Sequence, residues 1–381
     1  MKKIGILTLP LHTNYGGLVQ AFALQKVLKD LGYEAVTVHR VSKPKLVVKM
    51  ESFIKRSIKK YLLGRFDLVV KDWPSDEEAR VISQHTDKFI ERYIQLTEAI
   101  NSPEEYYKLN QMGFDGYVVG SDQVWRMYYT PGMPSYFLDF TKGVDSLKRV
   151  AYAASFGVDD WEFSEKMTQI CSSLAQEFNA ISVREDSGVD LCKKYFNVEA
   201  EHTLDPTLLI NSDVYSEMVD REHASLGQNV LYHYVLDKSA NKLEIINKVA
   251  DEKRLRVVAV MPQKKFSQVG SKGVESCIFP SVTEWLRGFR DSEYVVTDSF
   301  HGTVFSIIFR KPFIAIGNES RGMSRFQSLL KMFGLEDRLV FKSDQVNREL
   351  INKPIDYDRV GELLEKQKAF SIGFLKRALN E

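Results

Sequence analysis

The sequence opens with a strand–turn–helix–strand unit that decides the fold. Residues 3–9 read KIGILTL, a mainly apolar run of the kind that forms a strand buried on both faces. Residues 14–17 read NYGG, and the apolar side chains after them recur at helical spacing as far as residue 31. A second strand-like run, EAVTV, follows at 34–38. Strand, helix and strand in this order predict a parallel βαβ unit.

The same alternation continues along the chain and predicts two parallel sheets. Further strands are expected at 117–120, 150–156, 180–183, 230–235, 256–260, 294–297 and 312–316, and helices at 239–253, 281–291, 303–309, 324–333 and 357–378. We therefore expect an α/β protein of two Rossmann-like αβα domains that face each other across a cleft. The boundary falls at Asp205-Pro206, which gives an N-terminal domain at 1–205, a C-terminal domain at 206–345 and a C-terminal helical extension at 346–381.

The composition argues against several classes of protein. The chain has 381 residues with 52 basic and 51 acidic side chains, and its net charge of +1 disfavours a bulk attraction to nucleic acid. Three cysteines, at 171, 192 and 277, form no CxxC pattern or disulfide ladder, which is typical of a reducing compartment. The apolar start lacks a signal-peptide cleavage site, and no stretch reaches the ~18 apolar residues of a membrane-spanning helix. We expect a cytoplasmic protein.

The segment from Lys43 to Arg65 departs from this charge balance, with eight basic residues against the single acid Glu51. Five apolar side chains in it share one face of a helix: Val47, Met50, Ile54, Ile58 and Tyr61. A basic amphipathic helix can lie on the anionic inner face of a membrane or meet a lipid-linked substrate. The ordinary alternative is a surface helix that packs its apolar face on the domain while its lysines are solvated.

Residues that directly follow the strands are the candidates for function, because open parallel sheets bind ligands beyond the carboxyl ends of their strands. Asn14, Gly16 and Gly17 lie between the first strand and its helix. Glycines there let backbone amides approach an anion at a helix N-terminus, or merely relieve a tight turn. The pattern is neither GxGxxG nor a Walker loop, so it does not imply a nucleotide.

The second candidate set is GSDQVW at 120–125, after the strand at 117–120. Asp122 can orient or deprotonate a sugar hydroxyl, Trp125 can stack on a pyranose face, and Ser121 is counted with them as a binding residue. Alternatively, Asp122 caps the following turn and Trp125 belongs to the core.

Arg184 is the third candidate, because it stands between the strand at 180–183 and the next helix. The planar guanidinium suits the oxygens of a carboxylate or a phosphate. Alternatively, Arg184 pairs with Glu185 or Asp186 on the surface.

The fourth candidate is His301 in TDSFHG at 297–302, where a strand meets a helix. Its unperturbed pKa of about 6.5 suits proton transfer. Ser299 can donate a hydrogen bond to the same ligand, and Arg321 and Arg325 place two cations at a helix start, unless they are solvated charges on a loop. No histidine has the spacing of a metal site and no GxSxG elbow is present, so we expect no metal and no serine hydrolase.

Together these segments resemble the polysaccharide pyruvyl transferase family. The motifs occur in the family's order between about residues 10 and 335, and they are NYGG with QAFALQ (14–25), GSDQVW (120–125), SVRE (182–185), DPTLL (205–209) and TDSFHGT (297–303). The resemblance implies a fold similar to the GT-B glycosyltransferases, with the active site in the cleft. It also implies transfer of the enolpyruvyl unit of phosphoenolpyruvate to a hydroxyl of a free or lipid-linked saccharide, in cell-surface or exopolysaccharide biosynthesis.

In the implied reaction, protonation of the donor's methylene carbon creates an oxocarbenium-like centre. One sugar hydroxyl adds there, phosphate leaves, and a neighbouring hydroxyl closes a pyruvate ketal. His301 matches the family's histidine and is the expected acid/base, while Arg184 matches the arginine that would hold the donor's carboxylate or phosphate. Such chemistry needs no redox cofactor.

Ser299 departs from the family pattern, in which an arginine stands two positions before this histidine. We expect Arg321 or Arg325 to supply the missing charge from the neighbouring loop. Two other functions remain open on the sequence: a glycosyltransferase of similar fold that uses a nucleotide-sugar, and a non-catalytic saccharide- or phosphate-binding protein.

Overall fold

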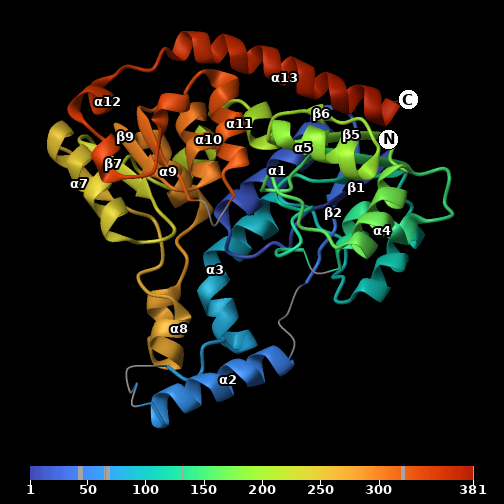
Figure 1. Cartoon of the computed structure of the whole chain (residues 1–381), viewed down its shortest axis with the longest axis horizontal. Helices are drawn as coiled ribbons and strands as arrows, with labels where there is room; N and C mark the ends of the chain where they lie inside the picture. The colour runs from blue at the N-terminus through green and yellow to red at the C-terminus, as the bar shows by residue number, and fades with distance from the viewer. Residues whose placement is uncertain (42–45, 64, 66–68, 131, 319–321, 381) are drawn as a thin grey trace.

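Two parallel sheets, each flanked by helices, form the body of the protein (Figure 1). The computed structural model describes residues 1–41, 46–63, 65, 69–130, 132–318 and 322–380. The predicted α/β class with two parallel sheets is confirmed.

The first sheet contains six parallel strands in the order β2-β1-β3-β4-β5-β6. The strands are β1 (Lys3–Leu7), β2 (Glu34–Thr37), β3 (Gly116–Val119), β4 (Lys148–Ala154), β5 (Ala180–Val183) and β6 (Glu201–His202). Their helices are α1 (Tyr15–Asp30), α3 (Asp76–Tyr93), α4 (Glu165–Ala175) and α5 (Asp186–Leu191), with short turns of helix at η1 (Pro103–Gln111), η2 (Met133–Phe137), η3 (Asp139–Thr141) and η4 (Cys192–Phe196). β1 is an interior strand, with Ile4 to Leu7 buried and with β2 and β3 paired on its two sides.

The second sheet contains five parallel strands in the order β11-β10-β9-β7-β8. The strands are β7 (Val230–Tyr234), β8 (Arg256–Val258), β9 (Tyr294–Thr297), β10 (Phe313–Ile316) and β11 (Leu339–Val340). The helices are α6 (Ser212–Asp220), α7 (Ala240–Lys253), α9 (Val282–Asp291), α10 (Phe300–Ile308), α11 (Ser324–Phe333) and α12 (Arg348–Asn352), with short helices at η5 (Pro206–Leu209), η8 (Glu336–Arg338) and η9 (Ser343–Gln345). α10 begins three residues before the predicted start because Ser299 caps it, so His301 lies in its first turn.

Side chains from the two sheets and their helices contact each other directly. Tyr15, at the start of α1, stacks on Trp285 of α9 with ring centroids 5.5 Å apart, and its hydroxyl donates to the carbonyl of Pro280 at 2.8 Å. The last helix, α13 (Tyr357–Asn380), runs from the second sheet back over the first (Figure 1), where Ser371 Oγ accepts from the backbone of Leu204. The domain limits at 205 and 345 stay a prediction.

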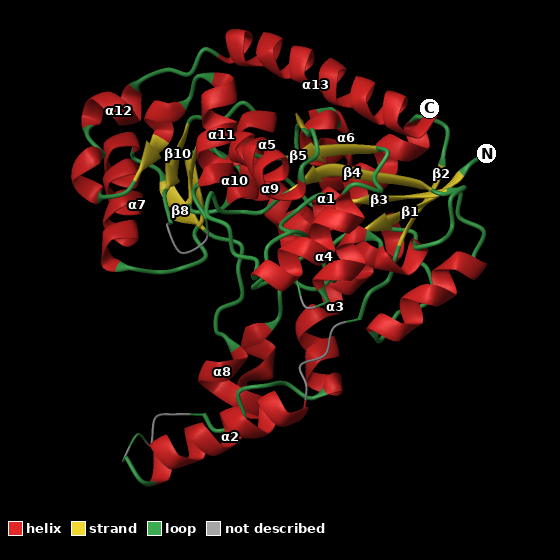
Figure 2. Ribbon diagram, turned by 45° about the vertical axis from the view of Figure 1, so that its right-hand side comes forward, coloured by secondary structure: helices red, strands yellow, loops and turns green. Residues whose placement is uncertain are grey.

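One helical segment projects from the body of the molecule. α2 (Leu46–Tyr61) lies apart from both sheets, beyond α3 and α8 (Phe266–Val269), in both ribbon views (Figures 1 and 2). We call α2 and the residues after it to Leu63 the arm, and α3 with α8 and η6 (Gly270–Cys277) the stalk. Within the described residues, none of the helices has both the length and the apolar character needed to cross a bilayer.

Candidate active site

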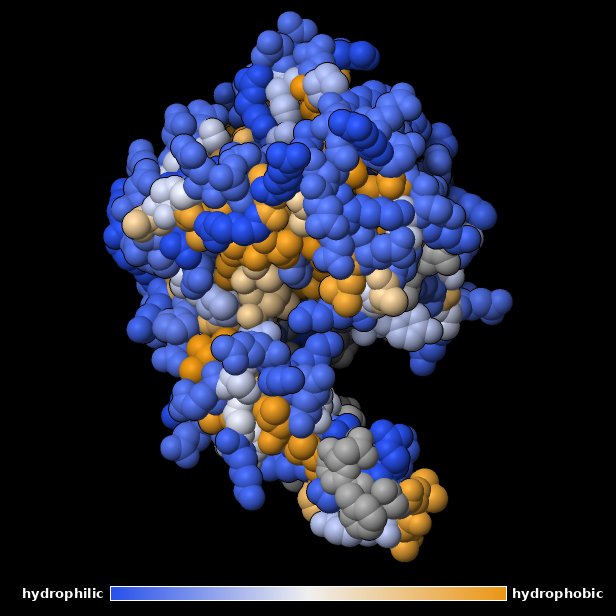
Figure 3. All heavy atoms as spheres, turned by 90° about the vertical axis from the view of Figure 1, so that its left-hand side faces the viewer, coloured by the Kyte–Doolittle hydropathy of each residue, from blue (hydrophilic) through white to orange (hydrophobic). Residues whose placement is uncertain are grey.

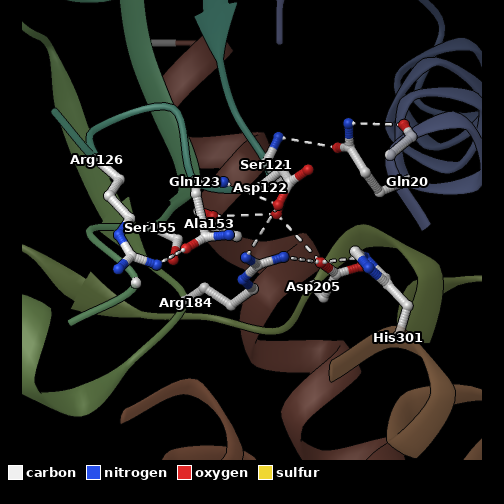
Figure 4. A network of polar contacts seen from close by, with 12 residues as sticks. Gln20, Ser121, Asp122, Gln123, Arg126, Ala153, Ser155, Arg184, Asp205 and His301 are labelled. Carbon is white, nitrogen blue, oxygen red and sulfur yellow. Dashed lines mark hydrogen bonds and ion pairs between the residues drawn. The ribbon is translucent and has the colours of Figure 1, made fainter. Parts of the chain in front are cut away.

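A cluster of buried polar side chains lies where the two sheets meet, and Figure 4 shows its members converging. Ser121 and Asp122 follow β3, and Arg184 follows β5. Asp205 comes after β6, while His301 reaches the cluster from α10, directly after β9 of the second sheet. Each residue therefore lies beyond the carboxyl end of a parallel strand, where such sheets bind ligands.

Asp205 connects the cluster, because one of its oxygens contacts three side chains. Oδ2 lies 2.7 Å from Arg184 Nη1, 3.2 Å from Ser121 Oγ and 3.5 Å from His301 Nε2. The other oxygen accepts from the backbone and hydroxyl of Thr207 at 3.0 and 2.7 Å. Burial opposes ionisation of Asp205, but His301 and Arg184 outweigh it and hold the pKa of this carboxyl far below its usual range. Asp205 is therefore a buried carboxylate.

Arg184 is a fixed cation at the centre of the cluster. Its side chain is 1% exposed, with Nη2 lying 3.4 Å from Asp122 Oδ1 and the guanidinium 4.4 Å from the centre of the Phe300 ring. Burial alone would lower the pKa of Arg184, but the carboxylates of Asp205, Asp122 and Glu185 raise it. Of the two predicted interpretations, the surface pairing is wrong.

Glu185 and Asp186 have other partners. The Glu185 carboxylate accepts from the Ser155 hydroxyl at 3.0 Å and from the backbone amides of Phe156 and Gly157 at 2.6 and 2.9 Å. The Asp186 carboxylate accepts a hydrogen bond from the Ser328 hydroxyl and pairs with Lys331 at 3.2 Å instead. Glu185 thus fixes the turn after β4 and leaves the Arg184 guanidinium to the two aspartates.

Asp122 caps the turn that follows it, as the alternative interpretation predicted, and its carboxylate also faces the cluster; its role toward a sugar hydroxyl stays a prediction. Its Oδ1 accepts from the backbone amide of Gln123 at 2.9 Å, as a turn cap does, and the same oxygen faces Arg184. The backbone at Asp122 has φ +68°, a left-handed conformation that aspartate tolerates better than most residues. Strained backbone of this kind is concentrated at functional sites.

His301 and Gly16 bring the first turns of two helices together. A Cβ built on Gly16 would lie 2.1 Å from His301 Nδ1, so only glycine lets α1 approach the imidazole this closely. A Cβ on Gly17 would have the Asn14 side chain as its nearest neighbour, at 3.2 Å. The close approach to His301 therefore requires a glycine at position 16 and not at position 17. Ser299 accepts from the amide of Gly302 and caps α10. Two helix N-termini facing one region favour a bound anion.

Arg325 places a second guanidinium beside the first. It belongs to α11, is 6% exposed and lies 5.6 Å from the centre of the Phe300 ring, over which Arg184 also lies. Burial, followed by the charge of Arg184, lowers the pKa of Arg325 to about 10. Two buried cations near each other are typical of a site for an anion. The other predicted cation, Arg321, lies outside the described residues.

Trp125 is a correction to the sequence prediction. Its side chain is fully buried, stacks on Phe137 at 4.8 Å and donates from Nε1 to the carbonyl of Tyr136. The core alternative therefore holds, and Trp125 offers no face to a sugar. Ser121 is also fully buried, with its amide donating to Gln20 Oε1 at 3.1 Å, so it supports the cluster from within.

Asp205 is the main residue that sequence reasoning missed as a site residue. The DPTLL segment marked a domain boundary and a family motif, although Asp205 also lies just after a strand, three residues beyond the end of β6. Among the residues that the structure describes, no group of three or more histidine, cysteine or acidic side chains is arranged to hold a metal ion.

Solved structures with this arrangement of sheets define the class: the fold is GT-B-like. The S. aureus MnaA-UDP co-structure matches with a TM-score of 0.56 and 14% identity, over 100% of this chain and 97% of that one. A putative UDP-N-acetylglucosamine 2-epimerase from Listeria monocytogenes matches with a TM-score of 0.54 and 11% identity, over 98% and 94%. At such identities the likeness shows the fold alone.

The family follows from the sequence. The model of the polysaccharide pyruvyl transferase family matches residues 14–320, so the chain belongs to that family, as its motifs predicted. The match also confirms the prediction of an enzyme of that kind. A search of curated proteins gives no match.

Proposed function

We propose that this protein transfers the enolpyruvyl unit of phosphoenolpyruvate to a saccharide hydroxyl and closes a pyruvate ketal. The observation that carries the proposal is the buried Arg184–Asp205–His301 array, with Arg325 beside it, in a member of this family. It combines an acid/base with cations suited to a trianionic donor. We place the reaction in the cytoplasm, in the synthesis of a cell-surface or exopolysaccharide.

The donor is proposed to bind between the two guanidiniums and the helix N-termini. Arg184 and Arg325 would hold its carboxylate and phosphate oxygens, and the Ser299 hydroxyl lies at the start of the same helix as His301. Arg325 then supplies the charge that the family's arginine provides at position 299. Burial and, after it, repulsion from Arg184 lower the pKa of Arg325, and a bound anion would offset that repulsion.

His301 would serve as acid and then as base. Its proton goes to the methylene carbon of phosphoenolpyruvate, whose double-bond electrons form the new C–H bond and leave an oxocarbenium-like C2. The Asp205 carboxylate, 3.5 Å from Nε2, orients the ring and stabilises the imidazolium. A sugar hydroxyl attacks C2 and gives its proton to the imidazole or to Asp122. Phosphate leaves with the C2–O electrons, and a neighbouring hydroxyl adds to C2 and loses its proton to the leaving phosphate.

Thermal unfolding with candidate ligands tests the choice of donor. Phosphoenolpyruvate should raise the midpoint selectively over UDP, UDP-sugars and inorganic phosphate, since a ligand at a hundred times its Kd stabilises a protein by about 2.7 kcal/mol. A response to UDP and UDP-sugars alone would favour the nucleotide-sugar glycosyltransferase instead. No response to phosphoenolpyruvate, even with acceptor saccharides present, would overturn the proposal.

Replacing His301 separates an enzyme from a binding protein. His301→Ala should lower kcat about 10²–10⁴-fold, the usual contribution of a positioned acid/base, while circular dichroism shows that the fold is retained. His85→Ala, on α3 in the stalk, is the matched control and should keep full turnover. Ligand binding without turnover in the parent protein would support the binding protein.

A further inference from the structure

The arm carries an apolar surface that nothing in the described structure covers. Among the described residues, seventeen large hydrophobic side chains are exposed, and seven of them fall within residues 50–63. These seven are Met50 (57% exposed), Phe53 (53%), Ile54 (51%), Ile58 (45%), Tyr61 (66%), Leu62 (78%) and Leu63 (67%). The predicted alternative, in which this helix packs its apolar face on the domain, is therefore wrong for these residues. Contiguous exposed apolar surface of this kind marks an interaction site.

The opposite face of α2 attaches the arm to the stalk and to the segment before α3. Arg56 donates to the carbonyls of Val69 and Ser267 at 2.6 and 2.8 Å, and Ser52 donates to Asp72 at 2.6 Å. Arg56 and Ser52 lie one helical turn apart, on the side away from Ile54 and Ile58. The apolar face consequently points outward, and Figure 3 shows apolar atoms at the tip of the arm beside hydrophilic ones.

The charge of the arm is the reverse of that of the remaining chain. The arm together with the residues that adjoin it, 43–65, contains eight bases and one acid, a net charge of +7, so the rest of a chain whose total is +1 carries −6. Lys55 lies at the border of the exposed apolar face, and its side chain is 74% exposed. Lysines at the border of an apolar face extend their stems along the apolar surface and keep their charges at its edge.

We propose that the arm docks the protein on an anionic lipid surface. An interfacial helix inserts its apolar face to the depth of the headgroups, while basic residues on its flanks meet the anionic lipids. The negative charge of the rest of the chain is repelled by the same surface, which orients the arm toward it. A second copy of the chain is the poorer occupant, because two 43–65 segments, each with a net charge of +7, repel each other. The inference does not depend on the proposed activity.

Co-sedimentation with vesicles tests the docking directly on the full chain. The protein should sediment with vesicles of phosphatidylglycerol and phosphatidylcholine in equal parts, and much less with phosphatidylcholine alone. Binding should weaken as salt shortens the Debye length from about 10 Å at 0.1 M to about 3 Å at 1 M. Equal binding to both vesicles, or no binding to the anionic ones at low salt, would overturn the proposal.

Two matched pairs of variants locate the effect on the arm. Ile58→Glu should weaken binding about tenfold or more, whereas Leu243→Glu on α7, where the leucine is 47% exposed against 45% for Ile58, should leave it unchanged. Lys55→Glu should weaken binding about tenfold, and Lys193→Glu should not. The two lysines match because their side chains are 74% and 71% exposed and each lies near one glutamate.

Two further measurements keep the outcome decisive. Because all four replaced residues are exposed, the thermal midpoints of the variants should equal that of the parent. Phe53→Trp should show a blue-shifted emission with the anionic vesicles and not with phosphatidylcholine, since the indole enters the interface only on docking. The proposal would be overturned if the Ile58→Glu variant bound anionic vesicles as tightly as the parent. It would also be overturned if the parent formed a dimer that this variant could not form.

Discussion

The protein holds positive charge in two environments that differ in almost every physical respect. In the candidate active-site cluster, Arg184 and Arg325 are 3% and 6% exposed and both lie over one phenylalanine ring. On the arm, the Lys55 side chain is 74% exposed and its ammonium group lies 3.8 Å from the Glu51 carboxylate. The buried cations are positioned individually, whereas the exposed ones act together as a patch.

This difference decides what each region can recognise. A buried guanidinium has its geometry set by neighbouring carboxylates and interacts strongly because little water screens it, so it discriminates between anions of different shape. An exposed lysine is screened within about 8 Å at physiological salt and discriminates little, but several of them add up on an extended anionic surface. The cluster is suited to one small ligand and the arm to a surface.

The largest effect is expected when the buried Arg184–Asp205 ion pair is broken. Asp205→Asn removes the carboxylate that contacts Arg184 at 2.7 Å and leaves the guanidinium with Asp122 as its nearest acid in the cluster. The free energy of unfolding in urea should fall by about 3–5 kcal/mol, since a buried charge is left poorly compensated. Asp358→Asn removes a similar contact to Arg310 on the surface and should cost no more than about 1 kcal/mol, because the Asp358 side chain is 92% exposed. Equal losses would contradict a difference between the environments.

The same pair should appear in the pH dependence of stability. The pKa of Asp205 is lowered in the folded protein, so its contribution is complete above the unfolded value of about 3.9 and is lost as the pH falls below it. Below about pH 4, the free energy of unfolding should therefore fall more steeply for the parent than for Asp205→Asn. Acids shared by both proteins cancel in this difference, and parallel slopes would indicate a pKa that folding leaves unchanged.

The next largest effect is expected when His301 is displaced without any change of charge. Gly16→Ala puts a methyl group 2.1 Å from His301 Nδ1, so the imidazole must shift. A displacement of about 1 Å at a reacting group can cost about 10²-fold, which we expect in kcat/KM for pyruvyl transfer. Gly361→Ala, in a helix where no heavy atom lies within 4 Å of the new Cβ, is the control and should keep full activity. A fully active Gly16→Ala enzyme would show that His301 tolerates displacement.

The sequence predicts the two ends of the array but not the group between them. Arg184 and His301 are recognisable because each follows a strand long enough to show as an apolar run. Asp205 follows β6, which has two residues, Glu201 and His202, and no apolar run marks so short a strand. The strand pattern therefore did not identify this carboxylate, which joins the two sheets, as a site residue, although it begins the DPTLL motif.

Burial is the other property that local patterns leave open. Trp125 stacks on Phe137, and neither the spacing nor the composition of GSDQVW shows that a later helix, η2, would cover it. The arm differs from Trp125 in the opposite direction, because a side expected to be covered is exposed. Its amphipathic pattern is evident in the sequence, but only the contacts with the stalk determine which face meets solvent. α3 was overlooked although its start carries a capping box formed by Ser75 and Glu78.

The smallest expected effect tests whether the two cationic regions differ in chemistry as well as in exposure. Arg325→Lys keeps a positive charge but removes the planar fork and its stacking over Phe300, so the affinity for phosphoenolpyruvate should fall about tenfold. Lys59→Arg makes the reverse exchange on the arm and should change binding to anionic vesicles less than about twofold, because a surface patch responds to charge and not to shape. Calorimetric titration of the first variant and co-sedimentation of the second provide the comparison. If both exchanges proved neutral, Arg325 would be acting in the cluster as a simple point charge, as the arm lysines do.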